Sequence, residues 1–275
     1  MRVRLVVNPR ARRALASGDA VRAALALRGV ECVRADDHPS GLDAIVVVGG
    51  DGTVVSQIAF AIANDLPIGV VPLGTFNDMA RTLGIPFAID AACDTIAVGV
   101  TRAIDVGRVN GKFFVNEASI GVSARIARRQ TPEAKRRFGV PGIIATTLQV
   151  LTHVVPFGVS IVQGDSCERF RSIQLTIANS DRFGSIWYAP DAAIDDGRLE
   201  LYSVEFTSFP QALHALHGLL WGRGDAIDGL RRRSGTRFEV VTRRRHHIVA
   251  DGEPAGYTPA CFELLPLAVR VFAPP

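Results

Sequence analysis

The sequence predicts an α/β domain followed by an antiparallel β-sandwich or barrel, on three observations. Residues Ile45–Thr53 read IVVVGGDGT, an apolar run typical of a buried parallel strand, and a helical pattern begins at Val54. A second short strand, Ile68–Val71, precedes a glycine-containing loop and a helix that extends through Arg81. From about Ile104, short strand-like segments separated by turns replace this alternation of strand and helix.

The glycine-rich loop after the first strand predicts a phosphate site. Glycines let the backbone turn sharply and approach a ligand without a Cβ in the way. Ligands bind at the carboxyl ends of the strands in open α/β sheets, and a following helix N-terminus favours an anion. Asp51 would repel a phosphate bound alone, but its carboxylate fits metal binding or proton transfer during phosphoryl transfer. A strand–turn–helix junction without a ligand is the alternative.

The loop after the second strand has the same character and reads PLGTFNDMARTLGIP. Pro72 and Gly74 indicate a turn, and Asn77 or Thr75 is expected to cap the following helix. Because both loops follow parallel strands, we expect them at the same edge of one sheet.

The second half of the chain contains seven strand-like segments. Asn110-Gly111, between the first two, is a strong hairpin signal. Helical patterns at 142–151 and 211–220 interrupt the strands. The uncharged stretch 138–164 resembles a membrane span in length, but its two halves have different periods, so we expect a helix followed by a strand. The seven segments read RAIDVGRVNG, KFFVNEASIG, GVSIVQGD, RSIQLTIANS, GRLELYSVEF, TRFEVVTRR and HHIVADGE.

Six blocks span the chain in a fixed order: NP at 8–9, GGDGT at 49–53, LGTFNDMAR at 73–81, FVNEASIGVSA at 114–124, APDAAIDDGRLEL at 189–201 and ADGEP at 250–254. In these blocks the chain resembles the diacylglycerol kinase catalytic-domain family, especially its soluble bacterial lipid-kinase branch, which is related to sphingosine and ceramide kinases. The resemblance implies a phosphofructokinase- or NAD-kinase-like α/β domain, a β-sandwich domain and an active site in the cleft between them. We expect domains at 1–103 and 104–262, with a final strand at about 263–275 returning to the first.

The resemblance also implies the function and the site residues. The expected activity is ATP-dependent phosphorylation of a hydroxyl of diacylglycerol or a related long-chain lipid. In these kinases the DGE acids are implicated as the base that activates the lipid hydroxyl, which suggests Asp251 and Glu253, with Asp51 serving metal and phosphate. The roles of these three acids are not separated, and a plain hairpin turn is the alternative for DGE. The ATP phosphates are expected at Asn8, Gly49, Gly50, Asp51, Gly52, Thr53, Gly74, Thr75 and Asn77.

Mg²⁺ is implied at two places. In the reaction it would neutralise charge on the phosphate oxygens. A second, structural Mg²⁺ is implied at the Asp196 carboxylate with the backbone carbonyls of Ala193 and Arg198, completed by water. An acidic turn between strands, with Gly197 supplying the bend, is the alternative.

Two departures from the family pattern concern the nucleotide side. Arg10–Arg13 replaces a turn of small residues, and residues 33–45 lack both a threonine and a helix that the relatives carry there. Weaker binding on the adenine side, or a degenerate enzyme, is therefore left open. The rival functions are a kinase of a soluble metabolite such as NAD, and a lipid-binding or regulatory protein with reduced catalysis.

Composition and charge indicate a globular protein inside the cell. Hydrophobic residues make up 48% and charged residues 21% of the chain, and the four cysteines are scattered, as in reduced cytosolic proteins. The basic cluster Arg125–Arg137 predicts attraction to anionic lipid headgroups, with a solvated face as the alternative. Only Phe138 is interleaved with these charges, so nucleic acid is not expected as a partner. We expect a cytoplasmic, peripherally membrane-associated protein, and a homodimer is left open.

Overall fold

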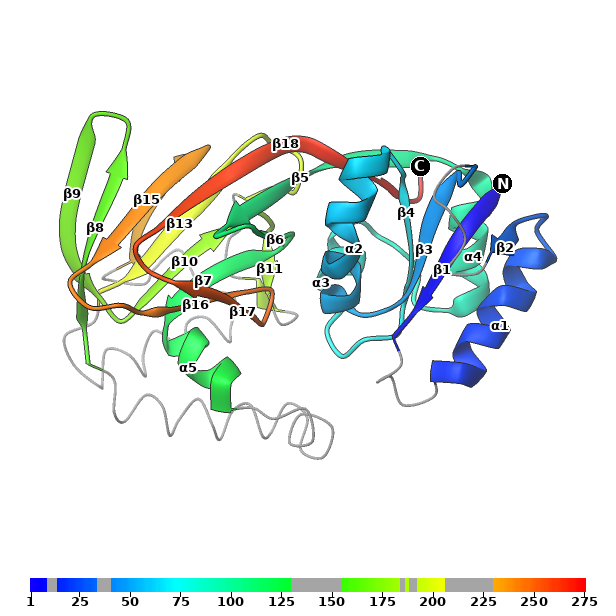
Figure 1. The fold of residues 1–275 in the computed structure, drawn as a ribbon, viewed down its shortest axis with the longest axis horizontal. Helices are drawn as coiled ribbons and strands as arrows, with labels where there is room; N and C mark the ends of the chain where they lie inside the picture. Colours follow the sequence, from blue (N-terminus) through cyan, green and yellow to red (C-terminus); the bar gives the residue numbers. More distant parts are fainter. Residues whose placement is uncertain (9–13, 34–40, 130–154, 184–185, 188–191, 206–229) are drawn as a thin grey trace. The chain divides into compact units, whose positions relative to one another are not determined.

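The computed structural model divides the chain into two compact units (Figure 1). The first unit contains Met1–Val106, Ile194–Gly197 and Leu265–Pro275, and the second contains Gly107–Ala193 and Arg198–Leu264. The boundaries expected from the sequence were 103 and 262, without the short return at Ile194–Gly197. The structure describes residues 1–8, 14–33, 41–129, 155–183, 186–187, 192–205 and 230–275.

The first unit is built on a parallel sheet. Its strands are β1 (Arg2–Val7), β2 (Glu31–Val33), β3 (Ala44–Gly49) and β4 (Ile68–Pro72), in the order β2-β1-β3-β4. Every residue of β3 and β4 is buried, which explains their unbroken apolar sequences. The last strand of the chain, β18 (Ala260–Phe272), pairs with β4 in parallel through Val271 and Ile68.

Helices cover both faces of this sheet. Figure 1 shows α1 (Ala14–Ala26) and α4 (Ile89–Val98) on one face, and α2 (Asp51–Asn64) with α3 (Asp78–Thr82) on the other. The buried residues of α2 are Val54, Ile58 and Ala61, the spacing of one helical face. The helix predicted after GGDGT is therefore confirmed, and it begins at the aspartate of the loop.

The second unit is an antiparallel sandwich. One sheet has the order β14 (Leu230–Gly235), β13 (Leu199–Val204), β10 (Gln174–Ala178), β7 (Glu117–Gly121), β16 (His247–Ala250) and β17 (Glu253–Tyr257). The other runs from β18 through β15 (Arg237–Thr242) and β8 (Phe157–Gln163) to β9 (Ser166–Ser172). Residues of both sheets form one core, which includes the fully buried rings of Phe114, Phe238 and Phe262.

Shorter elements complete the second unit. The strand β5 (Thr101–Val109) begins in the first unit and ends in the second, where it forms a hairpin with β6 (Lys112–Phe114). The strand β11 (Arg182–Phe183) pairs with β12 (Ile186–Trp187). Helix α5 (Val122–Arg129) follows β7 directly. The described residues thus form an α/β unit and a β-sandwich unit, which confirms the predicted fold class.

Local expectations for this half are confirmed where the structure describes them. Asn110 and Gly111 have φ of 49° and 74°, as a two-residue hairpin of type I′ requires. Val159 and Ile161 alternate on β8 and are buried, as predicted for a strand. The helices expected at 142–151 and 211–220 lie outside the described residues. None of the described helices is long and apolar enough to cross a membrane.

Candidate functional site

The carboxyl ends of three parallel strands bring the predicted phosphate residues together in the first unit. In the sheet register Val7 lies beside Val48, and Gly49 lies beside Pro72. The Asn8 backbone N–H donates to the Val48 carbonyl over 3.1 Å, which places Asn8 next to the glycine loop. The chain leaves β1 toward β2 on one side and returns to β3 on the other. This point between β1 and β3 is the switch point at which open α/β sheets bind ligands.

The GGDGT loop forms the N-terminus of α2. Gly50 is the N-cap residue with an extended backbone, and its carbonyl accepts from the N–H groups of Thr53 and Val54. Among the residues that the structure describes, no side chain makes a capping hydrogen bond at this helix end. The N–H groups of the first helical turn need partners from outside the helix, and anions commonly supply them.

Gly50 and Gly74 hold the two loops in close backbone contact. A Cβ built on Gly50 would lie 2.8 Å from the Gly74 Cα, and one built on Gly74 would collide with the Gly50 Cα. Both glycines are therefore required by the contact between the loops. Gly52 differs, because a Cβ there would meet no described atom within 4 Å. Gly52 is therefore exposed in the first turn of α2, and no described neighbour requires a glycine there.

Asp51 links the two loops through hydrogen bonds. Its carboxylate oxygens accept the backbone N–H groups of Asp78 and Met79, each over 3.1 Å, at the N-terminus of α3. This is the capping role expected of Asn77 or Thr75. Asn77 instead uses its amide on the backbone of Gly74, donating to the carbonyl over 3.0 Å and accepting from the N–H over 2.8 Å. Thr75 is exposed. Asn77 is thus the N-cap residue of α3, as expected, but the hydrogen bonds that cap the helix come from the Asp51 carboxylate of the neighbouring loop and not from the Asn77 side chain.

The DGE turn lies in the second unit and is a type I′ hairpin. Asp251 and Gly252 have φ of 44° and 82°, between the paired residues Ala250 and Glu253. The Asp251 carboxylate is turned onto the segment before β7. It accepts three backbone N–H groups, from Val115 over 2.6 Å and from Asn116 and Glu117 over 3.0 Å each. Asp251 thus fastens the turn to this segment.

The carbonyl groups of the same segment are bound by residues that the sequence analysis did not assign. The Asn179 side-chain amide donates to the Val115 carbonyl over 2.8 Å, and the N–H groups of Asn179 and Ser180 donate to the Asn116 carbonyl. Asn116, Asn179 and Ser180 are all buried. Three short polar motifs, VNE, ANS and DGE, therefore make one backbone-anchored cluster. VNE and DGE belong to blocks of the resemblance, whereas ANS, at 178–180, lies outside all six blocks and was not singled out from the sequence.

Glu253 is unlike the other two candidate acids. It is exposed at the first position of β17. Within the described part of the chain, its carboxylate has no hydrogen bond or ion pair. Of the three predicted catalytic acids, Glu253 is thus the exposed one, whereas Asp51 and Asp251 are half-buried and accept backbone N–H groups.

The predicted structural Mg²⁺ residues lie around the turn Ile194–Gly197. Asp196 is exposed, as are Ala193 and Arg198 on either side of the turn in the sequence. The neighbouring Asp195 already forms an ion pair of 2.7 Å with Arg102.

Asp105, which is fully buried, organises this turn and was not foreseen. Its carboxylate accepts the N–H groups of Gly197 over 2.7 Å and Leu267 over 2.6 Å. One exposed carboxylate with backbone carbonyls fits a weakly held Mg²⁺ that keeps most of its waters. Among the described residues, no group of three or more acidic, histidine or cysteine side chains gathers closely enough to hold a metal ion by side chains alone.

Comparisons with known proteins agree with this arrangement. Residues 2–109 match the diacylglycerol kinase catalytic domain, and residues 116–273 match the YegS C-terminal NAD kinase beta sandwich-like domain. A Bacillus anthracis structure described as a putative diacylglycerol kinase superposes with a TM-score of 0.82 at 23% identity, covering 100% of this chain and 95% of that one. This likeness shows the fold.

Relatives by sequence carry kinase names. A probable lipid kinase YegS-like of Pseudomonas aeruginosa is 30% identical, over 86% of this chain and 78% of that protein. A diacylglycerol kinase of Bacillus subtilis is 27% identical, over 84% and 78%. The chain spans only 54% of an uncharacterized Synechocystis protein with which it shares 28% identity. By both domain matches and by this similarity, the chain belongs to the family of diacylglycerol kinases and YegS-like lipid kinases.

Proposed function

We propose that the protein is an ATP-dependent lipid kinase that phosphorylates a hydroxyl of diacylglycerol or a related long-chain lipid. The observation that carries the proposal is the GGDGT loop, which places an uncapped helix N-terminus at the sheet's switch point with open space at Gly52. Backbone N–H groups and the helix dipole there favour a phosphate. The nucleotide phosphates are assigned to Asn8, Gly49–Thr53 and the following loop at Gly74–Asn77.

The acid chemistry is assigned to Glu253. The attacking lipid hydroxyl must lose a proton, and a carboxylate within hydrogen-bond reach can accept it. Asp251 is a poor candidate, because its oxygens already accept three backbone N–H groups. Glu253, in the same turn, is exposed. We therefore assign Glu253 as the base and Asp251 as the residue that positions the turn.

Asp51 has a combined role in the proposal. Each of its oxygens accepts one backbone N–H of α3, which leaves further lone pairs on both. Asp51 would hold the two loops together and also bind the cation that accompanies the nucleotide. A bound Mg²⁺ would supply charge neutralisation at the phosphate oxygens. A second, structural Mg²⁺ is proposed at Asp196 with the carbonyls of Ala193 and Arg198.

Access to the substrate is proposed to occur at a membrane surface. Arg125 in α5 is exposed and begins the basic cluster Arg125–Arg137, most of which lies outside the residues whose side chains the structure describes. Basic residues near an anionic membrane each contribute about 1 kcal/mol to its attraction. None of the described helices could span a bilayer. A peripheral association of this kind would bring the kinase to the lipid hydroxyl.

The proposal is tested by incubating the protein and a Glu253→Gln variant with radiolabelled ATP and a total lipid extract, then separating the products by thin-layer chromatography. We expect a labelled phospholipid from the parent and at least about a hundredfold lower rate from the variant, the usual contribution of a positioned general base. Labelled NADP from added NAD, without labelled lipid, would favour the metabolite kinase. Lipid binding with no labelled product would favour the regulatory protein.

A further inference from the structure

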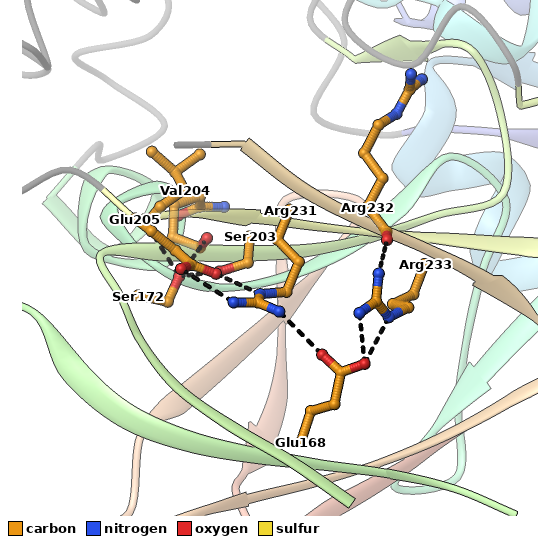
Figure 2. Close-up of polar contacts among 9 residues, drawn as sticks. Glu168, Ser172, Ser203, Val204, Glu205, Arg231, Arg232 and Arg233 are labelled. Atoms are coloured by element: carbon orange, nitrogen blue, oxygen red, sulfur yellow. Dashed lines mark hydrogen bonds and ion pairs between the residues drawn. The ribbon is translucent and has the colours of Figure 1, made fainter. Parts of the chain in front are cut away.

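The arginine runs of the second unit differ in their surroundings. The run Arg231–Arg233 on β14 is engaged by acids and aromatic rings. Arg231 forms ion pairs of 2.6 Å with Glu205 and 3.0 Å with Glu168. As Figure 2 shows, Glu168 lies between Arg231 and Arg233 and accepts from both.

This network has an architectural role. Arg232 lies over the Tyr202 ring, 5.1 Å from its centroid. Glu168 is on β9 and the arginines are on β14, the edge strands of two different sheets. The charges of Arg231 and Arg233 are thus compensated by Glu168 and Glu205 within the sandwich, and this run is a poor candidate for binding an external anion.

The run Arg243–Arg245, between β15 and β16, has no such compensation. All three arginines are exposed. In the part of the chain that the structure describes, none of them pairs with an aspartate or glutamate. The Arg245 guanidinium stacks 5.1 Å from the centroid of Tyr257, which is itself 44% exposed. We call Arg243–Arg245 together with Tyr257 the arginine turn.

The backbone of the arginine turn is held in place. The Thr242 hydroxyl donates to the Arg244 carbonyl over 2.7 Å and also bonds the Thr258 hydroxyl. The His246 N–H donates to the Thr258 hydroxyl over 2.9 Å. A turn fixed at both ends presents its side chains at a lower entropic cost than a loose loop.

Two basic residues outside the arginine turn lie near it, His246 directly after it and Arg125 on α5. His246 packs on Phe157 with ring centroids 4.4 Å apart. Burial, and then the charges of Arg125 and His247, hold the pKa of His246 below its usual value. Helix α5, which carries the exposed Arg125, also contacts β16, the strand that follows the arginine turn.

We propose that the arginine turn is a docking surface for the headgroups of anionic phospholipids. Guanidinium groups form bidentate hydrogen bonds to phosphate oxygens. Tyrosine side chains are common at the membrane–water interface, where the ring contacts apolar chains and the hydroxyl faces water. Single-stranded nucleic acid would need several aromatic rings for base stacking, and the arginine turn offers one. The inference extends the proposed lipid kinase, since it states how that enzyme would reach its substrate.

The test is co-sedimentation of the full chain with vesicles. One set is phosphatidylcholine alone, and the other is an equal mixture of phosphatidylcholine and phosphatidylglycerol. We expect binding to the mixed vesicles only, weakening as salt is raised. The triple variant R243S/R244S/R245S should lose binding by roughly a hundredfold, at about fivefold for each arginine.

A matched control removes the same charge elsewhere. Arg22, Lys112 and Arg169 are exposed on α1, β6 and β9 and pair with no described acid. The variant R22S/K112S/R169S should keep binding to within a few-fold of the parent. An equal loss in both triple variants, or unchanged binding in R243S/R244S/R245S, would overturn the proposal, as would parent binding to single-stranded RNA but not to the mixed vesicles.

A kinase assay on a short-chain, water-soluble diacylglycerol separates this inference from the proposed function. We expect the R243S/R244S/R245S variant to phosphorylate that substrate at the parent rate, because it needs no membrane. A parent that binds vesicles but shows no kinase activity would contradict the proposed function and retain the docking surface. A parent that is active on the soluble substrate but binds no anionic vesicles would contradict the docking surface and retain the proposed function.

Discussion

The substitution Asp251→Asn separates architecture from chemistry in the DGE turn. Asp251 has a left-handed backbone with φ of 44°, a conformation that asparagine adopts readily. The change therefore leaves the hairpin geometry intact and alters only the side-chain oxygens. One of these accepts the N–H groups of both Asn116 and Glu117, and the other accepts that of Val115.

The magnitude follows from these bonds. An asparagine oriented with its oxygen toward Asn116 and Glu117 keeps two acceptor contacts, now without charge, and turns an NH₂ group toward the Val115 N–H. Val115 is 1% exposed, so water does not replace the lost acceptor. Losing one bond to a charged group costs about 1.5–3 kcal/mol, and weakening the other two adds to this. We expect a loss of about 3 kcal/mol in the free energy of unfolding of the second unit.

The assay is thermal unfolding followed by a rate measurement well below the transition. A loss of about 3 kcal/mol corresponds to a decrease in Tm of roughly 6–12 °C for a unit of this size. Glu253→Gln, at an exposed position, should change stability by no more than about 0.5 kcal/mol and yet lower turnover about a hundredfold. If Asp251→Asn melted like the parent while abolishing turnover, and Glu253→Gln kept its rate, the two roles would be reversed.

Three further predictions concern other sites. Gly52→Ala should keep the fold and weaken ATP binding by at least tenfold in calorimetry. Gly50→Ala should also lower Tm, because its Cβ would lie 2.8 Å from the Gly74 Cα in the next loop. Normal ATP binding by Gly52→Ala would place the phosphates elsewhere. Hydrogen bonding by Arg233 holds the pKa of Glu168 below its ordinary 4.5. That stabilisation is present above about pH 4.5 and is lost as pH falls through the lowered value, so the stabilities of parent and Glu168→Gln should differ near neutral pH and converge in acid, and a constant difference would contradict this. Asp196→Ala should abolish the rise in Tm that Mg²⁺ causes without nucleotide, and an unchanged rise would refute the structural Mg²⁺ site alone.

Local patterns in the sequence predicted β3, α2, β4 and α3 of the first unit because those patterns have local physical causes. The apolar run Ile45–Val48 is buried on both sides, and the glycines that end it mark a real turn. The strand β14, in contrast, reads LRRRSG and has no apolar alternation. Its backbone pairs with β13, and its arginines are compensated by Glu168 and Glu205, which are 63 and 26 residues away in the sequence from Arg231. No window of local sequence contains that information.

The acids of the site show the same limit in a sharper form. Asp51 and Asp251 were both predicted from their motifs as chemical groups, yet each accepts backbone N–H groups of a segment distant in the chain. The three residues whose N–H groups bind Asp251 lie 134 to 136 positions before it in the sequence. A motif records that a carboxylate is needed but does not state whether the need is for a proton acceptor or for a cap. Hydrogen-bond partners decide the matter: a carboxylate filled by N–H donors fixes a loop, and an exposed one such as Glu253 is available to a substrate. The same reasoning separates the glycines, since Gly50 is required by a neighbouring backbone and Gly52 is required only if a ligand binds there.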